Sequence, residues 1–430
     1  MTTSEKTEKP SEIYTFRDED IARARDLVGV YHAMTQREQY TRASPDIMRN
    51  FARSYGDDNP LFTDEEHGAV TRWGGQITPP MVNIAVRKEL LADPVPREQR
   101  RPSFRGIHVF VSGTTTHWYR PILDGDTLYG FHGTEKVEEK QSEFAGRSLI
   151  ITGLQVQFNQ RAEVVQTQRV ITIHTERHES KKRKKYDSIE PASYTPDDIA
   201  RIDEIYAQEQ VRGANTRYWE DVEVGESLGT MAKGPLTTTD MVVFHSGGYG
   251  FAPYTPCASR LAYKNRQRIA PFYIPNEQGV PDVAQRIHWD SSYARSIGLP
   301  AAYDYGMMRD CWLSHYLTDW MGDDGWLESM SSQMRKFNYL GDTHTFTGEV
   351  VGKRSEGGRR LVDVELRGTS QRGEVTCPAT ATIALPSRAG GAVDLPAAPA
   401  DFEQLAARML QRDAELREER RRAAGNRTTS

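Results

Sequence analysis

The sequence has little cysteine and no long hydrophobic run. Its three cysteines, Cys257, Cys311 and Cys377, lie far apart, which fits neither a disulfide framework nor the paired spacing of a zinc site. No stretch approaches the roughly 18 consecutive apolar residues that a membrane-spanning helix needs, and the polar N-terminus lacks the pattern of a secretion signal. These absences predict a cytoplasmic protein with no membrane partner.

The sequence also lacks a positive net charge and cofactor-binding motifs, and each absence excludes a class of function. A net charge of −5 argues against a general nucleic-acid-binding protein. The sequence has no Gly-rich phosphate loop, no Rossmann fingerprint and no metal-ligand motif, so we predict no metal or other cofactor. The 430 residues, of which 37% are hydrophobic and 27% charged, indicate a soluble protein with more than one domain.

The most informative feature that is present is an internal repeat. "DEEHGAVTRWGGQITPPMV" begins at Asp64 and "DSSYARSIGLPAAYDYGMM" begins at Asp290, and the two reach Met81 and Met307 without a gap between them. Further along, "LDGDTLYG" and "YLGDTHTF" share a Gly-Asp-Thr tripeptide, which suits a turn before a strand. The two halves of the chain are therefore units of the same kind.

Each half also contains one helical pattern followed by strand-like runs. Apolar residues recur at helical spacing in "NIAVRKELLADP" and "RDCWLSHYLTDWMG", and runs such as "GIHVFVSGTTTHWY" and "RLVDVELRGTSQ" have strand composition. One helix with several antiparallel strands, twice over, predicts two α+β units, at residues 41–176 and 216–387. The remaining segments are an N-terminal extension (1–40), a charged linker with a short helix (177–215) and a charged helical tail (388–430).

These markers resemble the MaoC-like, (R)-specific enoyl-CoA hydratases and dehydratases, in the two-domain form with an N-terminal FAS1-like dehydratase domain. The resemblance covers both units, about residues 41–387. It implies a tandem hot-dog fold, in which an antiparallel sheet wraps a central helix in each unit. It also implies that an acyl-CoA is bound between the units, and that a trans-2-enoyl-CoA is hydrated to a (3R)-3-hydroxyacyl-CoA or the reverse. The partner expected from the resemblance is a second copy or a related hot-dog subunit.

The first half departs from the family's active-site segment, Gly-Asp-x-Asn-Pro-Leu-His-x-Asp. In "YGDDNPLFTD" the residues that match are Gly56, Asp57, Asn59, Pro60, Leu61 and Asp64. Phe62 occupies the histidine position, so this half resembles a site that has lost its base. Asp57 and Asn59 are candidates for substrate binding. The alternative is that they cap backbone N–H groups and keep a vestigial site in shape.

The second half carries the expected histidine. "IHWD" provides His288, and "DYGMM" provides Gly306 and Met307, with Tyr305 in place of the family's other histidine. The interval from Phe244 to Asp290 is 46 positions, against 13 from Phe51 to Asp64, so about 33 residues are inserted before this motif. The nearest acidic residue, Asp282, lies six residues before His288 instead of the family's five.

The resemblance makes His288 and Asp282 the catalytic candidates, and Tyr305, Gly306 and Met307 the substrate-binding candidates of this half. A histidine titrates near neutrality and can take a proton from water while a carboxylate orients it. The developing enolate would lie at a helix N-terminus beside Gly306, where free N–H groups favour negative charge. The alternatives are that His288 and Asp282 are ordinary turn residues, and that the Tyr305 ring only packs.

Two other classes of function stay open. Hot-dog folds also host thioesterases, which attack the carbonyl carbon, and a chain with a degenerate motif can be a non-catalytic acyl-binding subunit that supports a catalytic partner. Within the insertion, basic residues suit either CoA phosphates or a solvated loop. These residues are Arg260, Lys264, Arg266 and Arg268.

Overall fold

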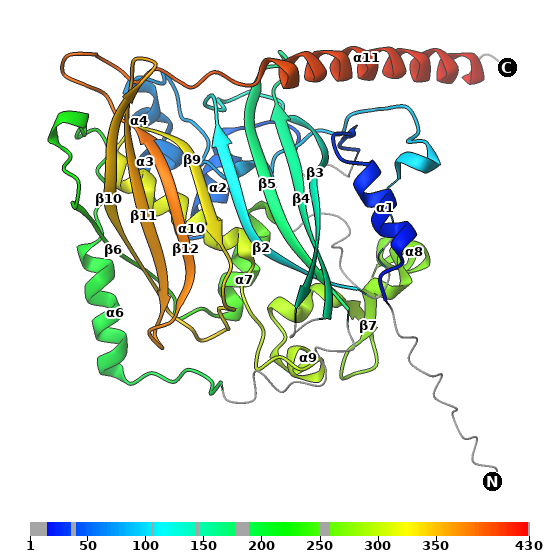
Figure 1. Ribbon diagram of the computed structural model, residues 1–430, viewed down its shortest axis with the longest axis horizontal. Coiled ribbons are helices and arrows are strands. Elements are labelled where there is room, and N and C mark those ends of the chain that lie inside the picture. Colours follow the sequence, from blue (N-terminus) through cyan, green and yellow to red (C-terminus); the bar gives the residue numbers. More distant parts are fainter. Residues whose placement is uncertain are drawn as a thin grey trace, which may run out of the picture.

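The computed structural model describes residues 15–35, 40–100, 102, 104, 107–142, 146–176, 189–249 and 259–428. Its main feature is an antiparallel sheet of ten strands in the order β1-β3-β4-β5-β2-β9-β12-β11-β10-β6 (Figure 1). The first five strands in this order come from the first half of the chain and the last five from the second. The half-sheets join where β2 pairs with β9, with Thr115 opposite Ser331. The predicted α+β tandem hot-dog is confirmed.

The elements of the first half follow the order that the repeat predicts. They are α1 (Asp18–Asp26), β1 (Tyr31–Ala33), α2 (Pro45–Ser54), α3 (Pro60–Thr63), α4 (Glu65–Val70), β2 (His108–Trp118), β3 (Tyr129–Ser142), β4 (Gly146–Phe158) and β5 (Val164–Thr175). A short 3₁₀ turn, η1 (Val82–Ile84), follows Met81. The segment 1–40, predicted as an extension, contributes β1, which pairs with β3 at the edge of the sheet.

The second half repeats this order with an insertion. Its elements are α6 (Pro196–Gln208), β6 (Ser227–Lys233), α7 (Thr238–Phe244), η4 (His245–Tyr249), α8 (Arg260–Arg268), β7 (Tyr273–Pro275), β8 (Pro281–Val283), η6 (Ala284–His288), α9 (Ser291–Ser296), α10 (Gly306–Met321), β9 (Trp326–Gln333), β10 (His344–Glu356), β11 (Arg359–Ser370), β12 (Val375–Ala384) and α11 (Ala400–Thr428). Part of the predicted insertion forms α8 and a separate hairpin of β7 with β8.

The repeat extends to individual hydrogen bonds at the two Gly-Asp-Thr turns. Gly125 and Gly341 have φ of 83° and 93°, which glycine adopts without strain. In each turn the aspartate accepts a backbone N–H three residues earlier and a glutamine amide from the next hairpin. These partners are Leu123 and Gln160 for Asp126, and Tyr339 and Gln371 for Asp342. The predicted turns are confirmed, with the aspartate bonding backward along the chain instead of forward.

Helix α10 is the central helix of the second half, as predicted. It begins at Gly306 and ends before Gly322, whose φ of 73° stops the helix. Fourteen of its sixteen residues, Met308 to Met321, are buried, because the helix lies against the sheet and is covered by the elements packed around it (Figure 1). A helix that is buried on all sides needs internal partners for its polar side chains, and these form the networks described below.

The matching helix predicted for the first half, over 83–94, does not form, and that prediction is wrong. After the short turn η1 the segment runs in an extended path. Its backbone N–H groups bond to other parts of the chain instead of to carbonyls four residues earlier. These bonds run from Arg87 to Tyr40, from Lys88 to Leu128 and from Leu90 to Met34. Tertiary hydrogen bonds therefore override the helical spacing of the apolar residues.

The C-terminal tail packs on the first half. Helix α11 extends along one end of the strands (Figure 1). Phe402, Leu405 and Met409 pack against the buried cluster that contains Phe131 and Phe158. The tail is helical, as predicted, and also completes a hydrophobic core.

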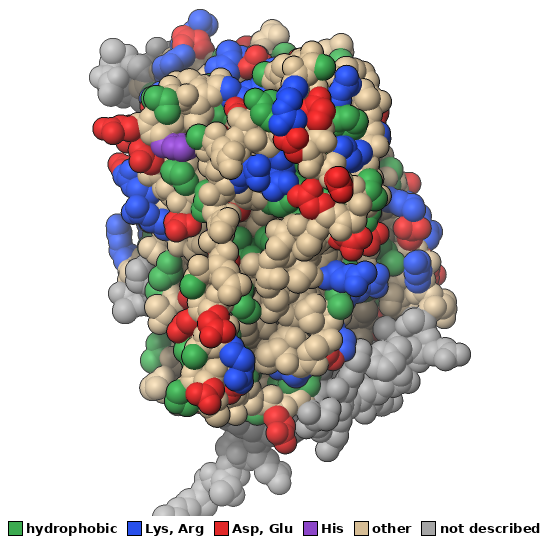
Figure 2. Space-filling view, turned by 90° about the vertical axis from the view of Figure 1, so that its left-hand side faces the viewer, with side chains coloured by type: hydrophobic (Ala, Val, Ile, Leu, Met, Phe, Trp, Pro, Cys, Tyr) green, Lys and Arg blue, Asp and Glu red, His purple; other side chains and the backbone are tan. Residues whose placement is uncertain are grey.

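The surface carries mixed charges. Figure 2 shows lysine and arginine side chains interspersed with aspartate and glutamate on the face that includes β6 and β10, without a broad field of one sign. Among the described residues, no helix is both long and apolar enough to cross a bilayer.

Candidate active site

The N-terminus of α10 lies at the centre of the candidate site. Tyr305 is the N-cap residue, and within the described chain no side chain caps the first turn. A Cβ added at Gly306 would be in van der Waals contact with the flexible side chain of Met334, at 3.5 Å. The helix dipole favours negative charge at this end of the helix. These properties suit an oxyanion.

His288 lies directly beside this N-terminus. Its ring stacks on the ring of Tyr305, with centroids 3.8 Å apart. Its Nδ1 is 2.8 Å from the backbone oxygen of Tyr303. A carbonyl only accepts hydrogen bonds, so Nδ1 carries the hydrogen and Nε2 keeps a lone pair. His288 thus has the tautomer that a general base at Nε2 requires.

Burial keeps His288 neutral. Loss of solvation lowers the pKa of His288 to about 4, and the hydrogen bond to the Tyr303 carbonyl only partly opposes this effect. At neutral pH the imidazole is therefore uncharged and can accept a proton.

A second histidine, which the sequence analysis did not identify, joins the same cluster. Nε2 of His245, in η4, lies 2.7 Å from the hydroxyl of Tyr305, and Gln285 donates to the same hydroxyl at 3.3 Å. Burial lowers the pKa of His245 to about 4. The Tyr305 ring is therefore fixed by its hydroxyl, and it fixes His288 in turn by stacking. His245 aligns with Ala52 when Phe51 and Phe244 are matched, so a comparison of the two halves of the sequence does not indicate a functional residue at His245.

Asp282 lies in the β7–β8 hairpin, opposite Ile274. Its Oδ1 accepts the backbone N–H of Val283 at 2.7 Å. No hydrogen bond or ion pair joins it to His288 in the described chain, where the Tyr303 carbonyl orients the imidazole. The pairing of Asp282 with His288 stays a prediction.

Asp57 and Asn59 belong to a different, fully buried network. The carboxylate of Asp57 accepts the Tyr55 hydroxyl at 3.1 Å and the Asn59 backbone N–H at 3.0 Å. The Asn59 side chain caps the N–H of Leu61 and donates to Asp319 of α10 at 3.2 Å. The two predicted residues are together, and they connect the first half to the central helix of the second.

His315 of α10 completes this network. Its Nε2 is 3.0 Å from Oδ2 of Asp319 and 3.6 Å from Oδ1 of Asp57, and its Nδ1 is 3.0 Å from Nζ of Lys233. Burial lowers the pKa of His315 to about 4 and raises the pKa of Asp319 to about 7. Burial also raises the pKa of Asp57 and lowers that of Lys233. The sequence offered a weak signal, since His315 and Asp319 share a face of the predicted helix at i and i+4.

Three residues of this network present atoms that can bind a metal. Ligand atoms of Asp57, His315 and Asp319 lie within 4.8 Å of one another. The ammonium of Lys233, adjacent to His315, already provides positive charge to the two carboxylates. Because this ammonium already lies beside the carboxylates as a cation, we assign the group no metal.

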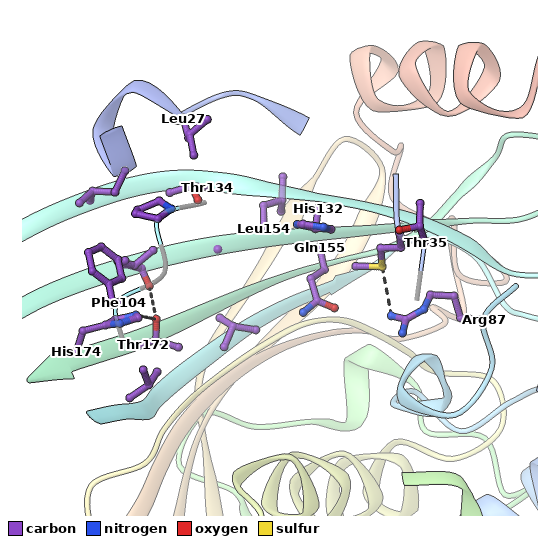
Figure 3. A pocket seen from close by; sticks show the side chains of 18 residues that line it. Leu27, Thr35, Arg87, Phe104, His132, Thr134, Leu154, Gln155, Thr172 and His174 are labelled. Atoms are coloured by element: carbon purple, nitrogen blue, oxygen red, sulfur yellow. Dashed lines mark hydrogen bonds between the residues drawn. The ribbon is translucent and has the colours of Figure 1, made fainter. Parts of the chain in front are cut away.

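In the part of the first half that the structure describes, the motif histidine position holds no base and no central helix forms. Phe62, at the histidine position, is 1% exposed and packs with Leu61 and Ile77 in a hydrophobic cluster. Where a central helix would lie, the sheet borders a cavity of about 660 Å³ (Figure 3). Apolar side chains such as Leu27, Phe104 and Ile151 line it together with polar ones.

Comparisons with known proteins agree with this architecture. Residues 32–168 match the family model described as the FAS1-like dehydratase domain region. A solved MaoC-like dehydratase matches with a TM-score of 0.56 at 18% identity, covering 83% of this chain and 98% of its own. A MaoC domain protein dehydratase from Chloroflexus aurantiacus matches with a TM-score of 0.50 at 13% identity, covering 89% and 99%. A search of the curated proteins finds no match.

The two joined half-sheets, the single central helix and these matches point to the same conclusion. The predicted resemblance is confirmed: residues 32–168 match the model of the FAS1-like dehydratase region, and the chain has the tandem hot-dog fold of the solved MaoC-like dehydratases to which it is similar.

Proposed function

We propose that the protein hydrates a trans-2-enoyl-CoA to a (3R)-3-hydroxyacyl-CoA, or catalyses the reverse dehydration. The observation that carries the proposal is the juxtaposition of a neutral histidine, whose Nε2 keeps a lone pair, and a helix N-terminus that begins with glycine and has no side-chain cap among the described residues. The first can activate water and the second can stabilise an enolate. The (R) configuration rests on the family resemblance.

In the proposed reaction, Nε2 of His288 takes a proton from water as the water oxygen bonds to C3. The C2–C3 double-bond electrons move to C2, and the negative charge is shared with the thioester oxygen. The backbone N–H groups at Gly306 and Met307 stabilise that oxygen. The imidazolium then returns a proton to C2, so that one water is added and His288 is regenerated. In the reverse direction the same groups remove water.

Other residues have supporting roles in this proposal. Tyr305 positions His288 through the stacked ring, and His245 positions Tyr305. Asp282 is the candidate carboxylate that orients His288. Catalytic contacts that are absent without substrate often form only when the substrate binds. Asp57 and Asn59 hold the first half against α10 and so keep the shape of the acyl site. The cavity of the first half accommodates the acyl chain.

An absorbance assay of the enoyl thioester tests the reaction directly. Purified protein is mixed with crotonyl-CoA and with a longer enoyl-CoA, and free CoA is measured in parallel. We expect loss of the enoyl signal without CoA release, and a decrease of kcat by about 10²–10⁴-fold in His288→Ala, as general acid–base catalysis contributes. His67 is half-buried and paired with Asp323, so His67→Ala is the matched control and should retain activity.

The same experiment distinguishes the proposed hydratase from the two alternative functions, a thioesterase and a supporting subunit. Stoichiometric release of free CoA would show a thioesterase. Absence of activity in the isolated chain, with activity restored by a related hot-dog subunit, would show a supporting subunit.

Asp282→Asn tests the role of the Asp282 carboxylate. We expect a decrease of kcat of at least tenfold, and an unchanged kcat would remove Asp282 from the site.

A further inference from the structure

The cavity of the first half is not lined as a purely apolar tunnel. Figure 3 shows His132 and Gln155 side by side on neighbouring strands, with Thr35 and Arg87 at one end and Thr172 and His174 at the other. Gln155 is half-buried and lines the cavity, directly opposite His132 on the neighbouring strand. An amide in such a position has donors and an acceptor available to a ligand.

The polar residues form a row across the sheet. Residues directly opposite each other on paired strands share a face, and His132, Gln155 and Gln168 are successive partners on β3, β4 and β5. The row continues to His32 on β1 and to Thr116 on β2. From β5 to β1 it spans three strand spacings, about 14 Å.

One end of this row meets the candidate active site. Nε2 of Gln168 lies 3.9 Å from Sδ of Met307, the residue after Gly306. A chain attached to a thioester at Gly306 can therefore extend along the row toward the outer edge of the first half-sheet. Gln155 and His132 are the first polar groups beyond Gln168 that line the cavity.

A second, more deeply buried row contains amides with atoms that have no hydrogen-bond partner in the described chain, although Nε2 of Gln157 donates to the backbone of Asn83. Gln157 and Gln166 are directly opposite each other, two residues along from the first row, and both are at most 2% exposed. Neither amide atom of Gln166, nor Oε1 of Gln157, nor Oδ1 of Asn83, has a hydrogen-bond partner in the described chain. Each such buried group costs about 1–3 kcal/mol unless water or a ligand satisfies it. These amides lie on the same face of the sheet as the first row, so the polar character of this face extends beyond the residues that line the cavity.

We propose, on the basis of the proposed function, that the preferred substrate carries an oxygen function on its acyl group, and that this hydroxyl or carbonyl bonds to Gln155 and His132. The oxygen lies several bonds beyond the thioester, at a distance set by the row. A site that bonds an oxygen discriminates against the analogue that lacks it, because the hydrogen bonds to that oxygen are then lost. The inner amides hold water or a second oxygen of the same ligand.

The test compares acyl-CoA pairs that differ only in the distal oxygen. Saturated medium-chain and long-chain acyl-CoAs, with and without a hydroxyl or keto group at successive distal positions, are titrated into the protein by calorimetry. We expect at least one position at which the oxygen lowers Kd by tenfold or more. In Gln155→Leu this preference should decrease at least fivefold, while Gln141→Leu, the same change at an exposed position of β3, should preserve it.

Binding is measured without turnover, so the outcome is separate from that of the hydration assay. Equal Kd values for the oxygenated and plain chains at every position would overturn the inference, even if crotonyl-CoA is hydrated. A preference for the oxygenated chain that is unchanged in both Gln155→Leu and His132→Phe would also overturn the inference, because another part of the protein would then bind the oxygen. Circular dichroism of each variant verifies that it is folded.

Discussion

At the residue scale, the candidate base is defined by what surrounds it. His288 has its tautomer fixed by a backbone carbonyl and its ring plane fixed by Tyr305. His288, Gly306 and Tyr305 were identified because they occupy positions of the active-site motifs of the family that the sequence resembles. It did not identify His245, because the contact with Tyr305 joins positions 60 residues apart and appears only when the chain is folded.

The pH dependence of activity follows from the burial of His288. Its folded pKa is about 4, against an ordinary value of 6.5, so the basic form persists as the pH falls through 6. We expect kcat/KM for crotonyl-CoA to stay level down to about pH 5 and to decrease below that value. An acid limb near pH 6.5 would contradict the assignment, because it would report a solvated histidine.

The same shift affects stability, with the sign that follows from a lowered pKa. Between pH 6.5 and about 4 the unfolded state binds more protons at this histidine than the folded state does. The contribution of His288 is therefore complete above pH 6.5 and is lost as the pH falls toward 4. Circular dichroism recorded across the same range distinguishes unfolding from protonation of the base.

The buried network at Asp319 gives a prediction about stability. In Asp319→Ala, the buried side chain of Asn59 loses the carboxylate that accepts its hydrogen bond, and buried His315 loses the carboxylate beside its Nε2. Each buried donor that is left without an acceptor costs about 1–3 kcal/mol. Urea unfolding should show a loss of this size, and Asp203→Ala, at an exposed position of α6, should show little change. A loss below about 1 kcal/mol would mean that the network contributes little.

At the scale of single elements, the two Gly-Asp-Thr turns should respond alike. Gly125→Ala and Gly341→Ala each place a Cβ on backbone with positive φ, which costs about 1–2 kcal/mol. Gly75→Ala is the control, since an added Cβ there has nothing within 4 Å and no positive φ. Thermal unfolding should show similar losses for the two turn variants and a smaller change for the control. Unequal losses would show that the two turns are equivalent in sequence only.

The elements also show what local sequence can and cannot predict. Strand β11 was predicted because Val362, Val364 and Leu366 alternate with charged residues, and those three side chains are buried. The helix after Met81 was predicted on equally good spacing and is absent. Its backbone is bonded to Tyr40, Leu128 and Met34, and a local pattern contains no information on such distant partners.

At the scale of the whole molecule, the tail stabilises the first half. Removing residues 400–430 would expose Phe131, Phe158 and their neighbours, and would remove the carboxylate of Asp413 that bonds to the N–H of Leu91. We expect a lower Tm and concentration-dependent aggregation in light scattering. A shorter truncation, after Arg420, leaves these contacts in place and is the control. An unchanged Tm in the longer truncation would show that α11 is only an appendage.

The pairing of β2 with β9 joins two units that have diverged, one with the central helix and one with the cavity. Two identical units in a symmetric dimer would offer two equivalent reaction centres and no additional room in either. In the fused chain the proposed chemistry is in one unit and the room for a bulky ligand is in the other. From the proposed function we therefore expect one ligand to bind per chain in a titration, with no cooperativity between the two halves of a chain.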